Sequence, residues 1–388
     1  MSALADQPHR QRVGILGGGQ LGRMMLQAGL DYDVDFCVLD PSPEAPCHRA
    51  CEFTCGSLTD AATVVAFGKS MDAVTIEIED VSVEGMRQLE DLGVRVVPSS
   101  AHVQLIQDKG LQKTFFKAKD IPTAAFTISH TLTSFPVVQK VRRGGFDGRG
   151  VKVLRSEEDE PLSKEACVLE ELIQIRKEVS VIVARTANET KAFPAAESVF
   201  DARANVASIV ACPPSPDVSS RTLAECEAIA KRVADELDFI GLLAVELFVT
   251  HQDEVLVNEI APRCHNSGHH TIEANATSQF SQLLRVVLNL PLGDVTATRP
   301  FAATVNILGD ADTPKGSPAS YAGVEDALKL PGVYLHLYGK ASVSPFRKMG
   351  HLTVCGHDRD AVLALAARLK AQVKCRFLDV SAPPPLLS

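Results

Sequence analysis

Two glutamates, Glu246 and Glu259, stand in apolar runs at 242–249 and 255–260, the pattern of a β-hairpin. If residues 252–253 form a two-residue turn, the two carboxylates lie directly opposite on one face, with Cβ atoms roughly 4.5–5.5 Å apart. Like charges in apolar surroundings repel and are costly to desolvate. A shared Mg²⁺, completed by substrate phosphates, would relieve that cost. A surface hairpin with solvated glutamates is the alternative.

Alternation along the two strands places Ala244, Phe248, Val257 and Ala261 on the face of the glutamates. The segment after the hairpin carries side chains that offer donors for an anion, namely Arg263, His265, Asn266 and His269.

A glycine-rich segment, RRGGFDGRGV at 142–151, lies between two expected strands. Lys140 and Arg149 stand at its edges. Because glycines let backbone N–H groups approach a ligand closely, the segment predicts a loop that closes over phosphates. A flexible polar hairpin is the alternative.

A second glycine-rich turn lies near the start of the chain. Gly17, Gly19 and Gly22 form G-x-G-x-x-G between an expected strand at 12–16 and a helix, and Asp40 ends the next strand. Taken alone, this is a dinucleotide-binding fingerprint. The same turn also serves other phosphate ligands, or close packing of helix on strand.

Other charged residues allow two interpretations each. Glu170 and Glu171 end one expected strand and Glu178 lies on the next, where they would accept from an adenine amino group and a ribose, or serve as strand-edge charges. Arg347 and Lys348 beside another strand suit an anion or a solvated turn.

The elements that must position these residues change along the chain. Strand–helix alternation up to about Pro98 predicts a parallel sheet with helices on both faces. A basic helical segment then opens with Asp108, Lys109 and Lys113. Amphipathic helices are expected at 219–239, with a Thr222-x-x-Glu225 capping box, and at 358–373.

Bulk properties narrow the class of protein. The 388 residues, with 45% hydrophobic and 22% charged side chains, suit two or three globular domains. The net charge of −9 argues against a nucleic-acid partner, and no apolar run approaches a membrane span. The ten cysteines show no disulfide-framework spacing, so a reducing, cytoplasmic setting is expected. A metal site at Cys47, Cys51 and Cys55 would lack a second ligand pair of the usual zinc spacing.

In their order, these features resemble the ATP-grasp superfamily: a glycine-rich first domain, a lysine-bearing lid, Glu-Glu then Glu, and a two-carboxylate hairpin ending N-E-x-A-P-R. The combination GGGQLGRM, GGFDGRGV, NEIAPRCHNSGHH and RKMGH is similar to the 5-(carboxyamino)imidazole ribonucleotide synthases, enzymes of purine synthesis that use ATP and bicarbonate. The resemblance covers roughly residues 12–375.

The resemblance implies an α/β architecture of the ATP-grasp fold. It comprises an N-terminal Rossmann-like (pre-ATP-grasp) parallel-sheet domain for the substrate nucleotide at 1–107 and a small α+β lid at 108–185. A C-terminal α+β domain with an antiparallel sheet, binding ATP and Mg²⁺, follows at 186–380, and a Pro-rich tail at 381–388.

The resemblance also implies site residues. Glu246 and Glu259 would hold Mg²⁺, as two ions. ATP would be contacted by Lys109, Lys140, Gly145, Phe146, Asp147, Gly148, Arg149, Gly150, Val151, Glu170, Glu171, Leu172, Ile173, Glu178, Asn258 and Glu259. The ribonucleotide would be contacted by Gln20, Leu21, Asp147, Arg263, His265, Asn266, Arg347 and Lys348. The catalytic residues would be Asp147, Arg149, Arg263, His265 and Lys348.

Some of these residues depart from the expected pattern. In a regular strand Asn258 would point away from Glu259, so its role requires a bulge or a backbone contact. Phe146 replaces the family's usual Tyr, and Cys264 replaces a Pro, which would loosen the phosphate loop. Asp80 and His270 stand where a His and a large aromatic residue are expected. None of these changes removes a charge partner, so activity is expected.

The implied reaction is ATP-dependent carboxylation of the exocyclic amine of 5-aminoimidazole ribonucleotide with bicarbonate, through carboxyphosphate. A homodimer is the family expectation. In fungi and plants the domain is typically fused to a carboxylase (mutase) domain, and the Pro-rich end would fit a cut before it. The alternatives are another ATP-grasp ligase, such as a formate-dependent glycinamide ribonucleotide transformylase, an NAD-linked oxidoreductase, or a catalytically silent nucleotide-binding subunit.

Overall fold

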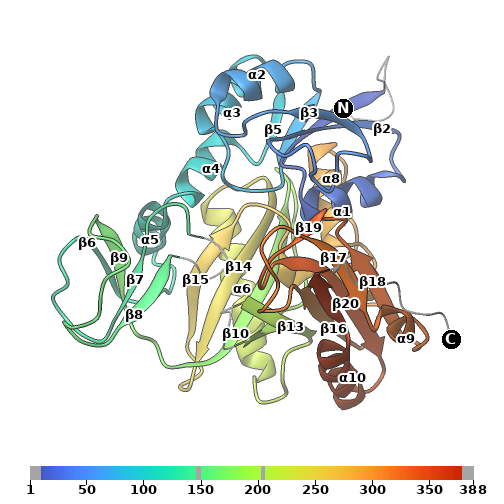
Figure 1. Cartoon of the computed structure of the whole chain (residues 1–388). Coiled ribbons are helices and arrows are strands. Elements are labelled where there is room, and N and C mark those ends of the chain that lie inside the picture. Colours follow the sequence, from blue (N-terminus) through green and yellow to red (C-terminus); the bar gives the residue numbers. More distant parts are fainter. Residues whose placement is uncertain (1–9, 146–149, 202–205, 378–388) are drawn as a thin grey trace.

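The computed structural model describes residues 10–145, 150–201 and 206–377. Figure 1 shows an N-terminal domain at the top, a small lid at the left, and a long sheet through the centre that continues into the C-terminal part at the right. Within the described ranges, no helix is both long and apolar enough to cross a membrane.

The N-terminal domain is built on a five-stranded parallel sheet in the order β3-β2-β1-β4-β5. In the central strand β1 the residues from Val13 to Leu16 are apolar or glycine and all are buried, as expected for a strand covered on both faces. Its strands are β1 (Gln11–Leu16), β2 (Val34–Asp40), β3 (Glu52–Cys55), β4 (Ala73–Ile76) and β5 (Arg95–Val97), with helices α1 (Gln20–Gly29), α2 (Ala61–Gly68), α3 (Val83–Asp91) and α4 (Ser100–Ile106).

The lid begins with helix α5 (Lys109–Ala118) and continues as a four-stranded antiparallel sheet. Asp108 caps α5 and also accepts a hydrogen bond from Arg142 at 2.7 Å. This contact ties the start of the helix to the segment that follows Lys140. In sheet order, the strands are β6 (Phe126–Ser129), β9 (Cys167–Glu171), β7 (Val137–Lys140) and β8 (Val151–Leu154).

The central sheet has nine strands, with the path β15-β14-β10-β12-β13-β16-β20-β18 and β11 paired to β10. Its strands are β10 (Ile175–Arg185), β11 (Thr190–Ala192), β12 (Ala196–Asp201), β13 (Val206–Cys212), β14 (Gly241–Thr250), β15 (Val255–Ala261), β16 (Phe301–Leu308), β18 (Val333–Leu337) and β20 (Lys348–Gly356). A three-stranded sheet, β19 (Ser342–Val343), β17 (Ser317–Ala322) and β21 (Lys374–Phe377), lies beside it.

The two faces of β10 and β14 differ. On one face Val181, Val245 and Leu247 are buried in an apolar cluster with α6 (Ser220–Glu236). The other face carries the polar residues of the site. The remaining helices are η1 (Asn266–Gly268), α7 (Thr271–Ala274), α8 (Gln279–Val287), α9 (Val324–Leu328) and α10 (Arg359–Gln372).

Two local expectations differ from the structure. The expected lid, 108–185, includes β10, but β10 pairs with β14 in the central sheet, so the lid sheet ends at Glu171. Helix α6 is capped by Ser219, which accepts from the backbone N–H of Thr222; the proposed Thr222 capping box is therefore displaced by one turn.

Candidate active site

Glu246 and Glu259 are directly paired across the β14–β15 hairpin, as the sequence predicts, but the predicted turn is wrong. The loop holds three residues, His251–Asp253, and Asp253 has a positive φ of 63°. This one-residue shift is cancelled by a bulge, because Glu246 pairs with Glu259 whereas Leu247 pairs with Val257. Val257 consequently lies in the apolar cluster behind the sheet, not on the glutamate face.

The extra residue in the bulge is Asn258. The bulge is fixed from outside the hairpin, because the N–H of Val257 donates to the carbonyl of Pro122 at 2.7 Å and the hydroxyl of Thr123 donates to the carbonyl of Val257 at 2.6 Å. Consecutive residues of a regular strand face opposite sides. With the bulge, Asn258 and Glu259 both reach lysines of the lid.

Those lysines are Lys109 and Lys140. The ammonium of Lys109, at the start of α5, is paired with Glu259. Lys140, at the end of β7, donates to Oδ1 of Asn258 at 2.7 Å. Burial opposes both charges of the first pair, but mutual attraction outweighs it, raising the pKa of Lys109 and lowering that of Glu259.

The other glutamate of the pair is held by a histidine. Nε2 of His265 lies 3.1 Å from Oε1 of Glu246, and Nδ1 of His265 lies 2.9 Å from the hydroxyl of Ser267. The loop that carries His265 is clamped by Gln279, which accepts from the His265 N–H at 2.9 Å and donates to the His265 carbonyl at 2.8 Å. Cys264, which stands in place of the expected Pro, is buried beside these contacts.

Glu178 completes an acidic row on the same face. It lies on β10 opposite Phe248, next to the position of Glu246 on the neighbouring strand. Burial and the charges of Glu246 and Glu259 raise the pKa of Glu178 to about 7. The row therefore accumulates negative charge that a bound cation would neutralise.

Lys113 was not among the expected site residues, yet it is part of this cluster. Its side chain is 2% exposed, and its ammonium lies 3.0 Å from Oε1 of Glu170. The second carboxylate oxygen of Glu170 lies 2.9 Å from the ammonium of Lys140. The Glu170 side chain, expected at an adenine hinge, is thus occupied by two lysines, whereas Glu171 is exposed.

The N-terminal domain contacts the hairpin through Arg263. Its guanidinium forms a two-bonded pair with Glu79, at 2.5 and 2.9 Å, and lowers the pKa of Glu79 although burial opposes this. Lys340 donates to the carbonyl of Lys348 at 2.7 Å, and Arg347 donates to the carbonyl of Ser342 at 2.7 Å. The expected anion-binding cations Arg263, Arg347 and Lys348 therefore all come from the C-terminal part of the chain, and Arg263 reaches the N-terminal domain through Glu79.

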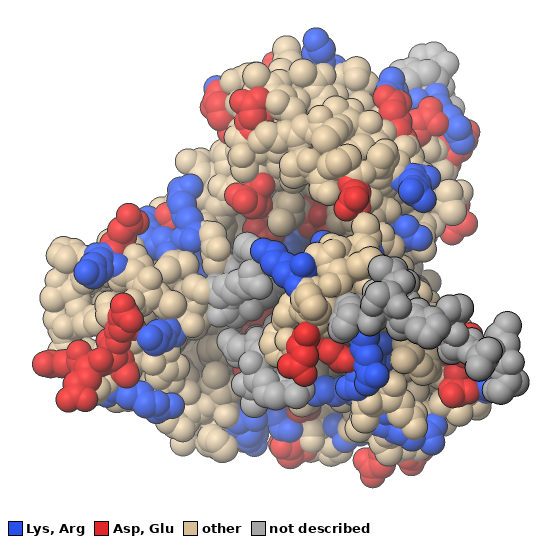
Figure 2. Space-filling view, viewed as in Figure 1, with Lys and Arg blue, Asp and Glu red and all other residues tan. Residues whose placement is uncertain are grey.

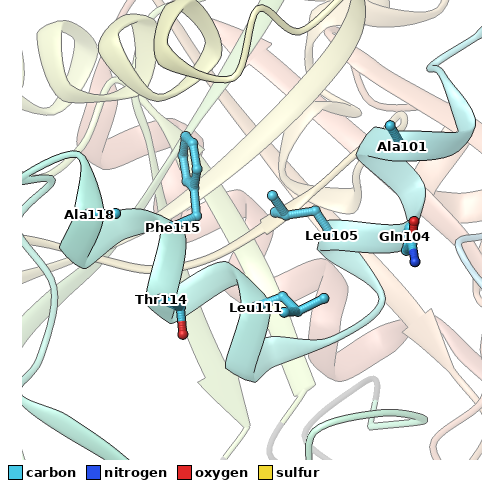
Figure 3. A pocket seen from close by; sticks show the side chains of 7 residues that line it. All are labelled: Ala101, Gln104, Leu105, Leu111, Thr114, Phe115 and Ala118. Atoms are coloured by element: carbon cyan, nitrogen blue, oxygen red, sulfur yellow. The ribbon is translucent and has the colours of Figure 1, made fainter.

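Figure 2 shows that the surface is hollowed below the N-terminal domain, with acidic and basic side chains around the hollow. A separate pocket of about 330 Å³ lies between α4 and α5, where Leu105, Leu111 and Phe115 dominate the lining (Figure 3). No charged side chain lines it, so it is unsuited to nucleotide phosphates, and the candidate site is the lysine–glutamate cluster.

Three family models match successive parts of the chain. The ribonucleotide synthetase preATP-grasp domain matches residues 10–107, the ATP-grasp domain 104–280, and the phosphoribosylaminoimidazole carboxylase C-terminal domain 302–365. The N5-carboxyaminoimidazole ribonucleotide synthase of Synechococcus elongatus is 35% identical over 91% of this chain and 91% of its own length. This chain belongs to the N5-carboxyaminoimidazole ribonucleotide synthase family.

Other relatives agree with this assignment. The chloroplastic phosphoribosylaminoimidazole carboxylase of Vigna aconitifolia is 36% identical over 90% of this chain, which spans 65% of that longer protein. The synthetase of Thermotoga maritima has a TM-score of 0.87 at 36% identity, covering 95% of this chain and 100% of the other. The Aspergillus clavatus synthase in complex with ADP and 5-aminoimidazole ribonucleotide has a TM-score of 0.82 at 28% identity, covering 92% and 99%. The expected ATP-grasp fold with a pre-ATP-grasp domain is confirmed.

Family membership agrees with the local geometry of the first glycine-rich turn. The carboxylate of Glu77 fills that turn: its Oε1 accepts from the N–H of Leu21 at 3.1 Å, and a Cβ on Gly19 would lie 2.5 Å from it. Asp40 accepts from the N–H of Gly18 at 2.8 Å. The pyrophosphate of a dinucleotide would have to displace the carboxylate of Glu77, and its ribose would have to displace that of Asp40. This argues against the NAD-linked alternative.

Part of the glycine-rich segment that was expected to cover phosphates lies outside the described residues, namely Phe146, Asp147, Gly148 and Arg149. At the edges of the loop, Gly150 has a φ of 90° and its carbonyl accepts from the N–H of Val141 at 2.9 Å. A Cβ on Gly150 would lie 2.6 Å from Val141 and 3.0 Å from Gly145. The loop therefore leaves the sheet through a position that requires glycine.

The structure also places the three cysteines, for which the sequence left a metal site open, and the remaining residues expected to bind the ribonucleotide. The described ranges contain no group of three His, Cys, Asp or Glu side chains that could hold a metal, so Cys47, Cys51 and Cys55 form no such site. Gln20 and Leu21 lie at the start of α1, with Leu21 buried, and Asn266 begins η1. Gln20 and Leu21 therefore lie beside the Glu77 turn, and Asn266 follows His265 in the loop after the hairpin.

Proposed function

We propose that this protein carboxylates the exocyclic amine of 5-aminoimidazole ribonucleotide with bicarbonate and ATP, giving N5-carboxyaminoimidazole ribonucleotide, ADP and phosphate. The observation that carries the proposal is the convergence of Lys109, Lys140 and Asn258 on the Glu246–Glu259 pair. Such a set of cations beside paired carboxylates suits a nucleoside triphosphate with its metal. Because the chain belongs to the N5-carboxyaminoimidazole ribonucleotide synthase family, we assign to this site the ATP-dependent reaction of the ribonucleotide.

ATP would lie between the lid sheet and the central sheet. Lys109 and Lys140 would bind its phosphates, the backbone at Glu171–Ile173 would face the adenine, and Glu178 would accept from the ribose. The glycine-rich loop at 144–151 would close over the phosphates. Excluding water matters here because carboxyphosphate hydrolyses readily.

Glu246 and Glu259 fit Mg²⁺ because they present hard oxygen donors on one face. His265 contacts Oε1 of Glu246 and Lys109 contacts Oε2 of Glu259, so each of these contacts uses one oxygen of a carboxylate that has two. Two carboxylates do not complete an octahedral shell, so phosphate oxygens and water would supply the other positions. When bound, the metal supplies charge neutralisation at the phosphates.

The ribonucleotide would bind between the N-terminal domain and the hairpin loop. Arg263, already oriented by Glu79, and His265 would face bicarbonate and the reacting phosphoryl group. Arg347 and Lys348 would bind the 5′-phosphate, with Gln20 and Leu21 beside it. Asp147 would orient the exocyclic amine, and Asp147→Ala should abolish carboxylation.

The test is ADP release with Mg-ATP and bicarbonate, with and without 5-aminoimidazole ribonucleotide. Strong stimulation by the ribonucleotide that requires bicarbonate would support both sites. ADP release stimulated instead by glycinamide ribonucleotide and formate would replace this reaction with that of a transformylase. ATP binding without ADP release, whichever substrates are added, would instead support a catalytically silent nucleotide-binding subunit.

We also propose a cytoplasmic homodimer. The proposal is supported by the family resemblance and by ten free thiols in the described residues. Sedimentation equilibrium of the purified chain measures the oligomeric state, and a monomer at micromolar concentration would contradict the proposed dimer.

A further inference from the structure

Six residues of the candidate site form a closed ring of contacts. Lys113 donates to the hydroxyl of Thr123 at 2.6 Å, and that hydroxyl donates to the carbonyl of Val257 at 2.6 Å. Val257 is bonded through the chain to Asn258, which accepts from Lys140 at 2.7 Å. Lys140 and Lys113 then share the carboxylate of Glu170, at 2.9 and 3.0 Å.

Both arms of the ring meet at Lys113. One arm runs through Thr123 to the bulge that presents Asn258 and Glu259. The other runs through Glu170 to Lys140. Lys113 itself is 2% exposed and Glu170 also 2%, so both side chains are almost completely enclosed by the protein. Burial lowers the pKa of Lys113 to about 8, but Glu170 keeps the ammonium form favourable.

The net charge of the ring determines whether the ammonium of Lys140 can attract an anionic ligand. Lys113 and Lys140 carry two positive charges and Glu170 one negative charge. In the native chain Lys113 neutralises Glu170, and one positive charge remains for an anionic ligand. Without Lys113, the carboxylate of Glu170 would have Lys140 as its only ammonium partner, and the net charge beside the ligand would fall to zero.

We propose that Lys113 is a positioning residue for the nucleotide site, which keeps the Lys140 ammonium available to ATP phosphates by neutralising Glu170 and bracing the Asn258 bulge. The inference rests on the ATP site of the proposed function but not on the carboxylation step. It predicts a defect specific to the phosphates of ATP.

The test compares binding of ATP and of adenosine by titration calorimetry, without ribonucleotide or bicarbonate. Lys113→Met should weaken ATP binding about tenfold or more, the effect of losing one charge-assisted contact, and leave adenosine binding within about twofold. Lys117→Met is the matched control, because Lys117 lies one turn later on α5 and is exposed. It should change neither affinity.

A second variant separates charge from packing. In the double variant Lys113→Met with Glu170→Gln, the net charge of the ring returns to the native value. It should bind ATP within about threefold of the native protein and more tightly than Lys113→Met. A merely structural role of Lys113 would instead make the double variant as weak as, or weaker than, the single one.

The outcomes are distinguishable from failure of the proposed function. A native protein that binds no ATP would overturn the ATP site itself. A native protein that binds ATP, with an unchanged ATP-to-adenosine ratio in Lys113→Met, would overturn only the role of Lys113. If Lys113→Met does not fold, the double variant alone decides. A folded double variant that has lost its preference for ATP over adenosine would also overturn the proposed role of Lys113.

Discussion

Glu246 and Glu259 face one another across a hairpin, and each is held by an N–H donor from a different direction: His265 on Glu246 and Lys109 on Glu259. These donors offset the mutual repulsion of the two carboxylates when no cation is bound. The same arrangement places both carboxylates where phosphates bridged by a metal would be met by Lys109 and Lys140. Lys109 therefore has two roles in this proposal: it stabilises Glu259 in the free protein, and it would contact phosphates when ATP is bound.

Glu259→Gln should lower ADP release at least about 100-fold, because the amide supplies no charge to a metal and no partner to Lys109. Ribonucleotide-stimulated ADP release measures the effect. Glu254→Gln, in an exposed position beside the turn of the same hairpin, is the control and should retain native activity. Substantial remaining ATP turnover in Glu259→Gln would remove the metal assignment.

Glu178→Gln should stabilise the empty protein at alkaline pH. The pKa of Glu178 is raised from 4.5 to about 7, so between these values the folded chain binds a proton that the unfolded chain lacks. Stability therefore falls as pH rises through this window, and the ionised Glu178 is a cost above pH 7 that the substitution removes. We expect a gain of about 1–3 kcal/mol at pH 8 and little gain at pH 4.5.

Urea unfolding without nucleotide or Mg²⁺ measures this gain, with Glu165→Gln, an exposed lid position, as the control. An equal change at both pH values would contradict the assigned environment of Glu178. The same substitution should weaken ATP binding, because Glu178 is the proposed acceptor for the ribose.

The pairing of the glutamates was predictable because apolar runs around a polar turn determine a hairpin. The bulge at Asn258 was not, because its cause is tertiary: Pro122 and Thr123, far away in the sequence, bind the backbone of Val257. The predicted pair is present only because the longer turn and the bulge shift the register in opposite directions. A correct contact therefore came from an incorrect turn.

Lys113 shows a second limit of sequence analysis. Lys109, Lys113 and Lys117 recur every four residues, which predicts one basic helix face. In the structure Lys117 is exposed whereas Lys113 is buried against Glu170 of the lid sheet. Only the packing of α5 against β9 distinguishes them. The glycine-rich turn was similarly ambiguous, since the carboxylate that fills it belongs to Glu77, which directly follows strand β4.

A buried stack of imidazoles should make the protein sensitive to acid. The ring of His351 stacks on His269 with centroids 4.7 Å apart and on His336 at 4.5 Å, and its Nδ1 lies 3.0 Å from the hydroxyl of Tyr338. Burial, with the neighbouring histidines, lowers the pKa of His351 and of His269 well below 6.5. Below pH 6.5 the unfolded chain therefore binds protons that the folded chain does not.

The free energy of unfolding should consequently fall as pH decreases below 6.5, by about 1.4 kcal/mol per pH unit for each such histidine. His351→Phe keeps an aromatic ring at this position but cannot bind a proton. The slope of its free energy of unfolding against pH, between pH 6.5 and 5, should therefore be smaller by about one proton, whatever its stability at pH 7.5. His130→Phe, at an exposed position, should keep the native slope. Urea unfolding across this range measures both slopes, and parallel curves for His351→Phe and the native protein would show that His351 is protonated in the folded state.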